Sequence, residues 1–236
     1  MTRSAHHLAA ALLGTLILSA CDGENPFVTP PAPLPVSNVT AVRGLTSAAI
    51  EEVSVTPPGY DLGTTTRTLP VENTGAAQFT LPLAPPLPGS LRRADTFLRE
   101  AGCHHTFTGT TYAATLLQRL PPLTGRHAGD QNAQGLTGYV IEQATPNTPA
   151  RAAGHVLYLY ADRPARLDGR LTCTAFWPTA AGRGEAVDVQ VGLVSGWNRL
   201  VLTDPTGTGA LALLNAPVTD RSPGDQWSVN GAPASP

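Results

Sequence analysis

Alternation of apolar and polar residues in the C-terminal half constrains the fold more than any other feature of this chain. Between residues 186 and 194, every second side chain is a Val or a Leu, and those between them are mostly polar or small. Successive side chains of a β-strand point to opposite faces, so this period of two predicts a strand with one buried and one solvated face. The apolar face consists of Val187, Val189, Val191 and Leu193.

A second segment, residues 155–161, is apolar on both faces. Such a pattern predicts a strand that is covered on both sides. The two faces consist of Val156, Tyr158 and Tyr160 on one side and Leu157, Leu159 and Ala161 on the other.

Composition extends the β prediction to the rest of the chain. Gly and Pro number 23 each, while charged residues make up only 14% of the chain. This balance favours short strands joined by many turns, and we predict an all-β fold of the β-sandwich type. Further strands are expected at residues 38–42, 51–56, 68–71, 77–83, 136–143, 166–176, 199–203 and 210–214, while residues 112–117 fit either a strand or a helix.

The sequence indicates one short helix after a Pro-rich break. Ser90 is expected to cap it, because a Ser side chain can accept a hydrogen bond from a backbone N–H of the first turn. Gly102 is expected to end it, because glycine readily takes the left-handed conformation that often follows a helix. One face of this helix would be apolar, with Leu91, Ala94, Phe97 and Leu98.

The N-terminus has the layout of an export signal. Arg3 precedes an apolar run at residues 8–17, which is too short to cross a bilayer as a stable helix, and small residues lead up to Cys21. The run LSAC that ends at Cys21 resembles a bacterial lipobox, and this resemblance implies cleavage before Cys21 and lipidation of its thiol. Two or more acyl chains on one residue would anchor the protein stably in a membrane. An ordinary secretory signal followed by a free thiol is the alternative.

These patterns divide the chain into four parts. The Pro-rich linker favours the extended polyproline II conformation, and Trp227 in the tail could pack back onto the body. The parts are a lipoprotein signal peptide (residues 1–20), the Pro-rich linker (21–36), a β-sandwich body (37–218, with a candidate internal boundary near 84–90) and a flexible tail (219–236).

Lipidation of Cys21 would leave Cys103 and Cys173 as an even pair in an oxidising compartment. We predict a disulfide between them. It would close a loop of about 70 residues and remove about 4 kcal/mol of unfolded-state entropy if the chain-entropy model holds. Two buried free thiols are the alternative, because the sequence does not show whether the two Cα atoms lie within bridging distance. The absence of a C-x-x-C motif argues against a redox or metal pair.

Charge and motifs argue against several classes of function. All 15 basic residues are Arg, and the absence of Lys excludes Walker A loops, Schiff-base chemistry and Ser-Lys dyads. A net charge of -2 with scattered Arg indicates no nucleic-acid partner. We expect no cofactor and no metal: His104 and His105 would point to opposite faces of a strand. The polar run from Asp130 lacks the carboxylate that a calcium loop needs at its twelfth position.

No motif marks a catalytic site. The chain lacks G-x-S-x-G and H-E-x-x-H, although a Ser-His-Asp triad could still be assembled by the fold. Asp162 beside Arg163 is expected to form an ion pair at a strand end. The histidines that such a triad could use are His104, His105, His127 and His155.

Residues 196–198 are expected to form a structural turn. Gly196 can supply a backbone conformation that β-carbons disfavour, Asn198 can bond its own turn, and Trp197 can cover the end of the sandwich. In a glycan-binding protein, Trp177 and Trp197 would instead be exposed as a stacking platform.

Five short motifs carry a family resemblance: FTLP at 79–82, GC at 102–103, YLYADR at 158–163, LTC at 171–173 and GWN at 196–198. Their order resembles uncharacterised β-rich exported proteins and lipoproteins of high-GC bacteria. The early part is also similar to carboxypeptidase-regulatory or transthyretin-like sandwiches, in which a Phe-Thr-Leu strand follows a turn. The resemblance implies an immunoglobulin- or transthyretin-like β-sandwich and supplies no catalytic residues.

Together these observations predict a non-enzymatic lipoprotein, exported and anchored to the membrane of the bacterial cell envelope through Cys21. Its body would be a binding or structural module for an envelope protein or a glycan. The alternatives are a hydrolase of wall or extracellular polymer with a site assembled by the fold, and a glycan-binding module with exposed aromatics. A pocket where a His, an acid and a Ser converge would favour the hydrolase, and a flat aromatic strip would favour glycan binding. The sequence predicts no oligomeric state.

Overall fold

Strands dominate the part of the chain that the structure describes. The computed structural model describes residues 39, 41–46, 50–55, 65–66, 77–127, 129, 131–142, 151–177, 182–216 and 225–229. Contacts place all of these in one compact unit, Pro33–Pro236. The predicted signal peptide, Cys21, the linker and the strand expected at 68–71 lie outside the described residues. None of the described helices is long and apolar enough to cross a membrane.

The described residues form strands, one short α-helix and one 3₁₀ helix, which confirms the predicted all-β class with a single short helix. The first elements are β1 (Ala41–Thr46), β2 (Ile50–Val55), β3 (Thr65–Thr66), β4 (Ala77–Pro82), the 3₁₀ helix η1 (Pro88–Ser90), β5 (Arg92–Arg93), α1 (Ala94–Glu100) and β6 (Cys103–His105). They are followed by β7 (Leu116–Arg119), β8 (Leu123–His127), β9 (Gln134–Glu142), β10 (Arg151–Ala161), β11 (Ala165–Cys173), β12 (Ala186–Leu193), β13 (Gly196–Thr203), β14 (Ala212–Asn215) and β15 (Asp225–Val229).

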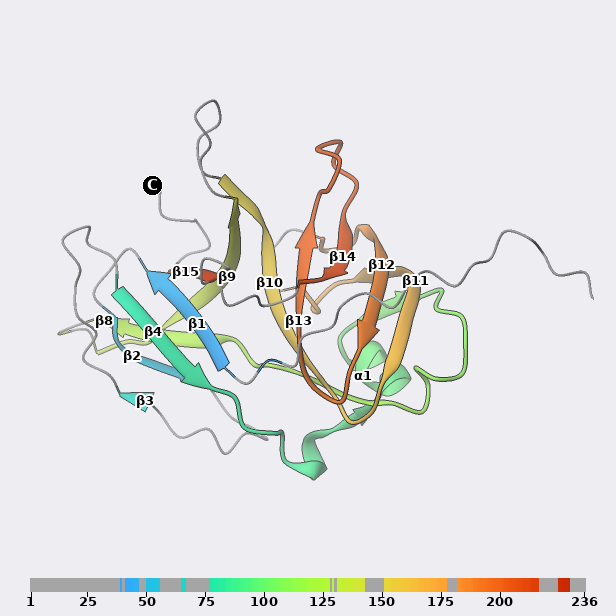
Figure 1. Cartoon of the computed structure of the whole chain (residues 1–236), viewed down its shortest axis with the longest axis horizontal. Helices are drawn as coiled ribbons and strands as arrows, with labels where there is room; N and C mark the ends of the chain where they lie inside the picture. Colours follow the sequence, from blue (N-terminus) through green and yellow to red (C-terminus); the bar gives the residue numbers. More distant parts are fainter. Residues whose placement is uncertain are drawn as a thin grey trace, which may run out of the picture. The chain divides into compact units, whose positions relative to one another are not determined.

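Hydrogen bonds join these strands into one branched sheet. One path through it runs β3-β2-β8-β9-β10-β13-β14-β12-β11-β6, and β1, β4, β5, β7 and β15 lie off that path. Among the described pairs, β1 with β15 and β12 with β14 are parallel, and the others are antiparallel. Figure 1 shows β10 beside β13, with β12 and β11 following on one side and β9 on the other.

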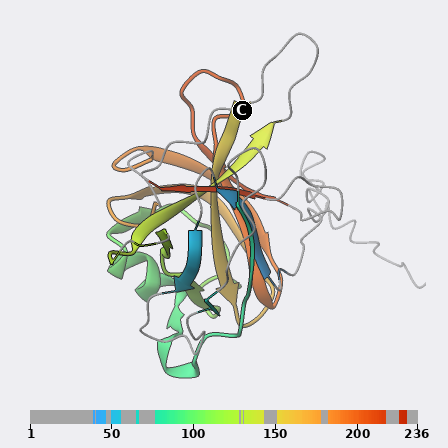
Figure 2. The same cartoon turned by 90° about the vertical axis from the view of Figure 1, so that its left-hand side faces the viewer.

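β10 and β13 form a wall between two hydrophobic cores. In β10, Leu157 and Leu159 face the first core, whereas Val156 and Tyr158 face the second. This alternation confirms that the strand predicted at 155–161 is covered on both sides. Figure 2 shows β10, in yellow, running through the middle of the described elements.

The first core lies between this wall, α1 and the strands β11 and β12. It includes the four apolar residues of the alternating strand β12, so the buried face predicted for residues 186–194 is confirmed. Its buried residues are Ala94, Leu98, Cys103, Phe107, Leu117, Leu157, Leu159, Ala161, Leu167, Leu171, Cys173, Phe176, Trp177, Val187, Val189, Val191, Leu193, Leu200, Leu202 and Leu213.

The second core lies on the other face of the wall and is closed by strands from both ends of the chain. Its buried residues are Val39, Val42, Val53, Phe79, Leu81, Leu83, Leu120, Leu123, Leu136, Val156, Tyr158, Trp197, Val201 and Trp227. Both ends of the described chain therefore contribute to a single core.

The short helix forms where it is expected but begins differently. α1 starts after Arg93, and no side chain caps it, so the prediction that Ser90 is the N-cap is wrong. Residues 92–93 are extended and pair with β7, and the Ala94 N–H donates to the Thr115 carbonyl at 2.9 Å. Thr115, the residue just before β7, thus supplies a partner for one of the N–H groups that a helix leaves unpaired at its start. Gly102 has φ +65°, as expected for the residue that ends the helix.

β15 lies inside the segment expected to be a flexible tail. It pairs with β1 and β9, and Trp227 is buried beside Tyr158, with ring centres 6.4 Å apart. Residues 225–229 therefore belong to the body, because one large aromatic side chain buries enough apolar surface to hold a short strand in place.

A buried ion pair joins β15, the strand of Trp227, to β13. The side chains of Arg199 and Asp225 are only 8% and 5% exposed and form an ion pair, and the Tyr158 hydroxyl donates to Asp225 Oδ2 at 2.5 Å. Burial opposes the charge of Arg199, but the hydrogen bonds and charge of Asp225 outweigh burial and raise the pKa of Arg199. Burial and the Asp225 carboxylate raise the pKa of Tyr158 well above 10.0. The buried Asp225 carboxylate thus accepts hydrogen bonds from two side chains, Arg199 and Tyr158.

Candidate functional site

The predicted cysteine pair is bonded in the structure. Cys103 and Cys173 are opposite each other on β6 and β11 and form a disulfide, with Cα atoms 4.0 Å apart. Two backbone hydrogen bonds, from Thr174 to Gly102 and from Ala175 to Ala101, lie beside it. The bond and these contacts fasten the end of α1 to the sheet.

Residues 196–198, expected to form a turn, are the first three residues of β13 and directly follow a bend at Ser195. Gly196 has φ +104°, which is strained for any residue with a β-carbon. Asn198 is fully buried, and its Nδ2 donates to the carbonyls of Leu159, Val194 and Gly196 at 3.3, 3.0 and 3.0 Å. Its Oδ1 accepts the Val194 N–H at 2.9 Å. The amide side chain therefore satisfies backbone groups on both sides of the turn.

Neither tryptophan considered for glycan stacking offers its ring to solvent. Trp197 is 3% exposed, and its Nε1 donates to the Ala84 carbonyl at 3.0 Å. Trp177 is 2% exposed in the first core. A glycan platform would have to use other aromatic residues.

The histidines do not gather at one place. His104 is exposed on β6, while the neighbouring His105 packs between Phe107 and Tyr112. His155 on β10 packs against Tyr139, and burial lowers its pKa below 6.5. The side chain of His127 and the residue Asp130 lie outside the described part of the structure. Among described residues, no group of three or more His, Cys, Asp or Glu could hold a metal ion.

Among the described histidine side chains, His105 lies beside a carboxylate. Its Nε2 is 3.5 Å from Asp95 Oδ1 on α1. Burial raises the pKa of Tyr112, and the charge and hydrogen bond of Asp95 add to this effect. Phe107 stacks on the His105 ring at 4.9 Å. These contacts explain the cluster as packing of β6 against the helix.

Asp162 and Arg163 form the ion pair expected at the end of β10, with Nη2 and Oδ2 2.8 Å apart. Asp162 Oδ1 also accepts the Leu116 N–H at 2.7 Å. Burial alone would raise the pKa of Asp162, but the hydrogen bonds from Arg163 and Leu116 outweigh it and lower the pKa below 3.8. The carboxylate therefore links β10 to the start of β7, a contact that the sequence does not indicate.

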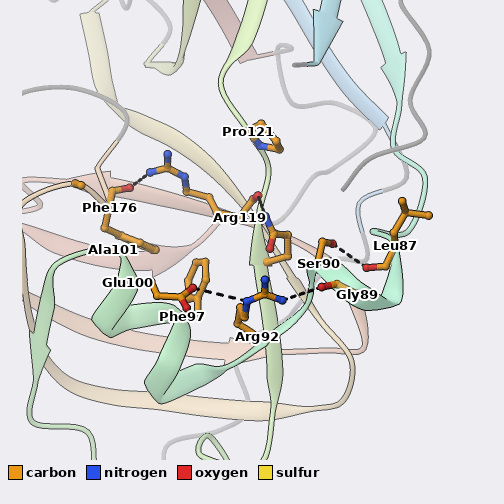
Figure 3. Close-up of a pocket in the computed structure, with 12 residues that line it drawn as sticks. Leu87, Gly89, Ser90, Arg92, Phe97, Glu100, Ala101, Arg119, Pro121 and Phe176 are labelled. Carbon is orange, nitrogen blue, oxygen red and sulfur yellow. Dashed lines mark hydrogen bonds and ion pairs between the residues drawn. The ribbon is translucent and has the colours of Figure 1, made fainter. Parts of the chain in front are cut away.

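A groove of about 700 Å³ opens beside α1 and is the best candidate for a binding site (Figure 3). Four separate stretches of chain line it: η1 with β5, the end of α1, β7 with Pro121, and the two residues that follow Thr174. Twelve residues contribute: Leu87, Gly89, Ser90, Arg92, Phe97, Glu100, Ala101, Gln118, Arg119, Pro121, Ala175 and Phe176.

The rim formed by η1 comes from the Pro-rich break near residues 84–90. Leu87 is the large apolar residue left 50% exposed at this rim. The Ser90 hydroxyl, considered above as a helix cap, instead donates to the Leu87 carbonyl at 2.8 Å. The break thus shapes one side of the groove.

Positive side chains outnumber negative ones in the lining of the groove. Arg92 Nη1 donates to the Gly89 carbonyl at 2.8 Å (Figure 3). It also donates to the Leu91 carbonyl at 3.1 Å, and the two bonds orient the guanidinium. Glu100 Oε2 lies 3.8 Å from Arg92 Nε, but the side chains are 59% and 45% exposed, so solvent screens this pair. With Arg119 as a second cation, the lining carries one net positive charge.

An aromatic wall stands next to Arg119. Its Nη1 donates to the Phe176 carbonyl, and its guanidinium carbon lies 5.9 Å from the centre of the Phe176 ring. Phe97, which is half-buried, meets Phe176 edge to face with ring centres 6.0 Å apart. Because Phe176 also contacts Trp177 in the first core, Phe97 rests on a rigid aromatic support.

This chemistry fits binding better than acid-base catalysis. The lining has apolar faces, two guanidinium groups and one carboxylate, and no histidine is among its twelve residues. The sequence alone does not mark Arg92 as a binding residue, because an exposed Arg near a helix is common and belongs to no motif. Comparison with known proteins adds no further constraint: no protein-family model, curated protein or solved structure matches this chain.

Proposed function

We propose that the protein is an exported lipoprotein, anchored to a membrane of the bacterial cell envelope through Cys21, and that its β body is a non-enzymatic binding module. The groove beside α1 carries this proposal. Its volume of about 700 Å³ is typical of sites that enclose a small ligand, and its lining combines apolar faces with a few oriented charges.

The N-terminal sequence supports the anchor. An apolar run too short to span a bilayer ends in small residues and Cys21, and a Pro-rich segment separates Cys21 from the first described strand. The disulfide is compatible with a compartment outside the cytosol. A module held near the membrane in this way would meet its ligand within the envelope.

The hydrolase alternative has less support from the groove. Ser90 and Glu100 both line it, but the Ser90 hydroxyl donates to a backbone carbonyl. His105, which lies beside the Asp95 carboxylate, does not line it. A Ser-His-acid relay requires these groups in hydrogen-bonding contact.

Intact-mass analysis of the full chain, purified from the membranes of an expressing bacterium, tests the anchor. We expect a mass for a chain that begins at Cys21 and carries at least two acyl chains. Cys21→Ala should leave the signal uncleaved or release the protein from membranes, while Ser37→Ala, beyond the linker, should behave like the natural chain. A processed chain without lipid would refute the anchored lipoprotein.

A further inference from the structure

The groove beside α1 has a lining that selects for the charge and shape of its ligand. Arg92 and Arg119 oppose a single carboxylate, Glu100, so the groove attracts one negative charge and repels a second one near Glu100. Leu87 and Phe97 supply apolar surface on either side of Arg92 (Figure 3). We infer that the groove binds a flat aromatic monoanion, such as an aryl carboxylate; this inference rests on the proposed binding function.

Arg92 provides the contact for the negative charge of the ligand. Its Nη1 atom is held by the carbonyls of Gly89 and Leu91, so the guanidinium is already oriented before a ligand arrives. A guanidinium presents several N–H donors in one plane, and those that the two carbonyls do not occupy can donate to a carboxylate. Preorganisation of this kind lowers the entropy lost on binding.

Phe97 provides the aromatic contact. It is half-buried and rests edge to face on Phe176, which is 2% exposed and packed against Trp177. An aryl ring placed against Phe97 would extend this edge-to-face series, a geometry that aromatic rings prefer. A flexible alkyl chain would gain the apolar contact without this geometry.

The volume argues for a small molecule over a protein surface. A groove of about 700 Å³ has room for a ligand of modest size. A stable protein partner would need roughly 1,200–2,000 Å² of buried surface, most of it outside such a groove. The occupant is therefore a free small anion.

Calorimetric titration with 2-naphthoate tests this inference. The full chain, as the bacterium processes it, is held in detergent-free nanodiscs, and empty nanodiscs give the background. We expect 2-naphthoate to bind more tightly than 2-naphthalenemethanol, octanoate or 2,6-naphthalenedicarboxylate. Equal affinity for the neutral alcohol, or tighter binding of the dicarboxylate, would overturn the inference, and so would the absence of measurable binding of 2-naphthoate.

Matched variants separate the groove from general effects. Arg92→Gln should weaken 2-naphthoate binding by about tenfold or more, because it removes a charge-assisted hydrogen bond. Glu100→Gln should strengthen it by about two- to fivefold, since an exposed repulsive charge is lost. Arg99→Gln, an exposed Arg of α1 outside the groove lining, should leave affinity unchanged. If Glu100→Gln weakened binding, or Arg92→Gln and Arg99→Gln had equal effects, the groove would not be the site.

Misfolding would weaken binding, so a gain of affinity in Glu100→Gln can only be a direct effect on the groove. This result would show that the weaker binding of the other variants is not simply a consequence of misfolding. Phe97→Leu keeps an apolar side chain and removes the aromatic face. We expect binding several-fold weaker, with only a small decrease in melting temperature from the lost edge-to-face contact with Phe176. If the chain is lipidated and membrane-bound but does not bind 2-naphthoate, this ligand class is refuted and the proposal of a lipid anchor is not. A chain that binds 2-naphthoate but carries no lipid would refute the anchor alone.

Discussion

The small side chain of Asn198 makes several hydrogen bonds to buried backbone groups. Its amide bonds three carbonyls and one N–H while fully buried near the start of β13. Replacement by Ala would leave several of these backbone groups without partners, and each buried orphan is costly.

We expect Asn198→Ala to lower the free energy of unfolding by about 2–3 kcal/mol, measured by urea denaturation. Ser195→Ala is the matched control from the same turn, because the Ser195 hydroxyl is exposed and makes one neutral hydrogen bond, to the Asp162 carbonyl. A loss in Asn198→Ala no larger than in Ser195→Ala would contradict the structural role of Asn198.

At the level of residues, local conformation was predictable and partners were not. Gly196 and Gly102 both have the positive φ that their positions in the sequence indicate. The carbonyls that Asn198 binds, and the N–H that Asp162 accepts, come from segments whose proximity depends on the folded sheet. No spacing in the sequence encodes such contacts.

The disulfide acts at the level of elements, because it joins the end of α1 to β11. It closes a loop of 70 residues, and loss of such a crosslink is expected to lower the free energy of unfolding by about 4 kcal/mol. We expect reduction, and the paired change Cys103→Ala with Cys173→Ala, to produce the same decrease in urea denaturation.

Two checks accompany this prediction. Reductant should have no further effect on the paired variant, and neither treatment should remove lipid from Cys21. Peptide mapping under non-reducing conditions should recover the two cysteines in one linked fragment. Recovery of two free thiols from envelope-derived protein would refute the bridge.

Elements with their own alternating pattern were predictable, but their pairing was not. β12 follows directly from a period of two in the sequence, and the second half of β10 follows from a run that is apolar on both faces. The parallel pairs of β12 with β14 and of β1 with β15 join segments by tertiary contact alone. β15 was missed because its surroundings are rich in Gly, Pro and Ser, while the burial of Trp227 outweighs that local signal.

For the whole molecule, the pair Arg199 and Asp225 links the last described strand to the central wall. Asp225→Asn would leave Arg199 buried without a countercharge, a change that typically costs about 3–5 kcal/mol of unfolding free energy. We expect this loss in urea denaturation. The double variant Arg199→Met with Asp225→Asn should recover part of it, because the buried charge is then absent while Tyr158 keeps an acceptor.

An exposed pair supplies the control. Arg170 and Asp188 lie on neighbouring strands with side chains 68% and 60% exposed. Asp188→Asn should therefore change stability by less than about 1 kcal/mol. If Asp225→Asn cost as little, β15 would be a loosely attached element.

The groove was not predictable because it exists only in the whole molecule. Its lining comes from four stretches that are separated by up to about ninety residues, and none of them carries a motif. Its Pro-rich rim was readable in the sequence only as a break in the strand pattern. Sites of this kind depend on tertiary placement, which residue order alone does not encode.

The wall formed by β10 has a consequence for how the chain reaches its native state. Between residues 156 and 161, its odd-numbered side chains pack in one core and its even-numbered side chains in the other. A slip of its pairing by a single residue would exchange the two sets and place Tyr158 where Leu157 or Leu159 belongs. Neither interior could then close. A β10 strand in the wrong register therefore gains no stabilisation from either core. Correct pairing of this strand and exclusion of water from both cores occur together.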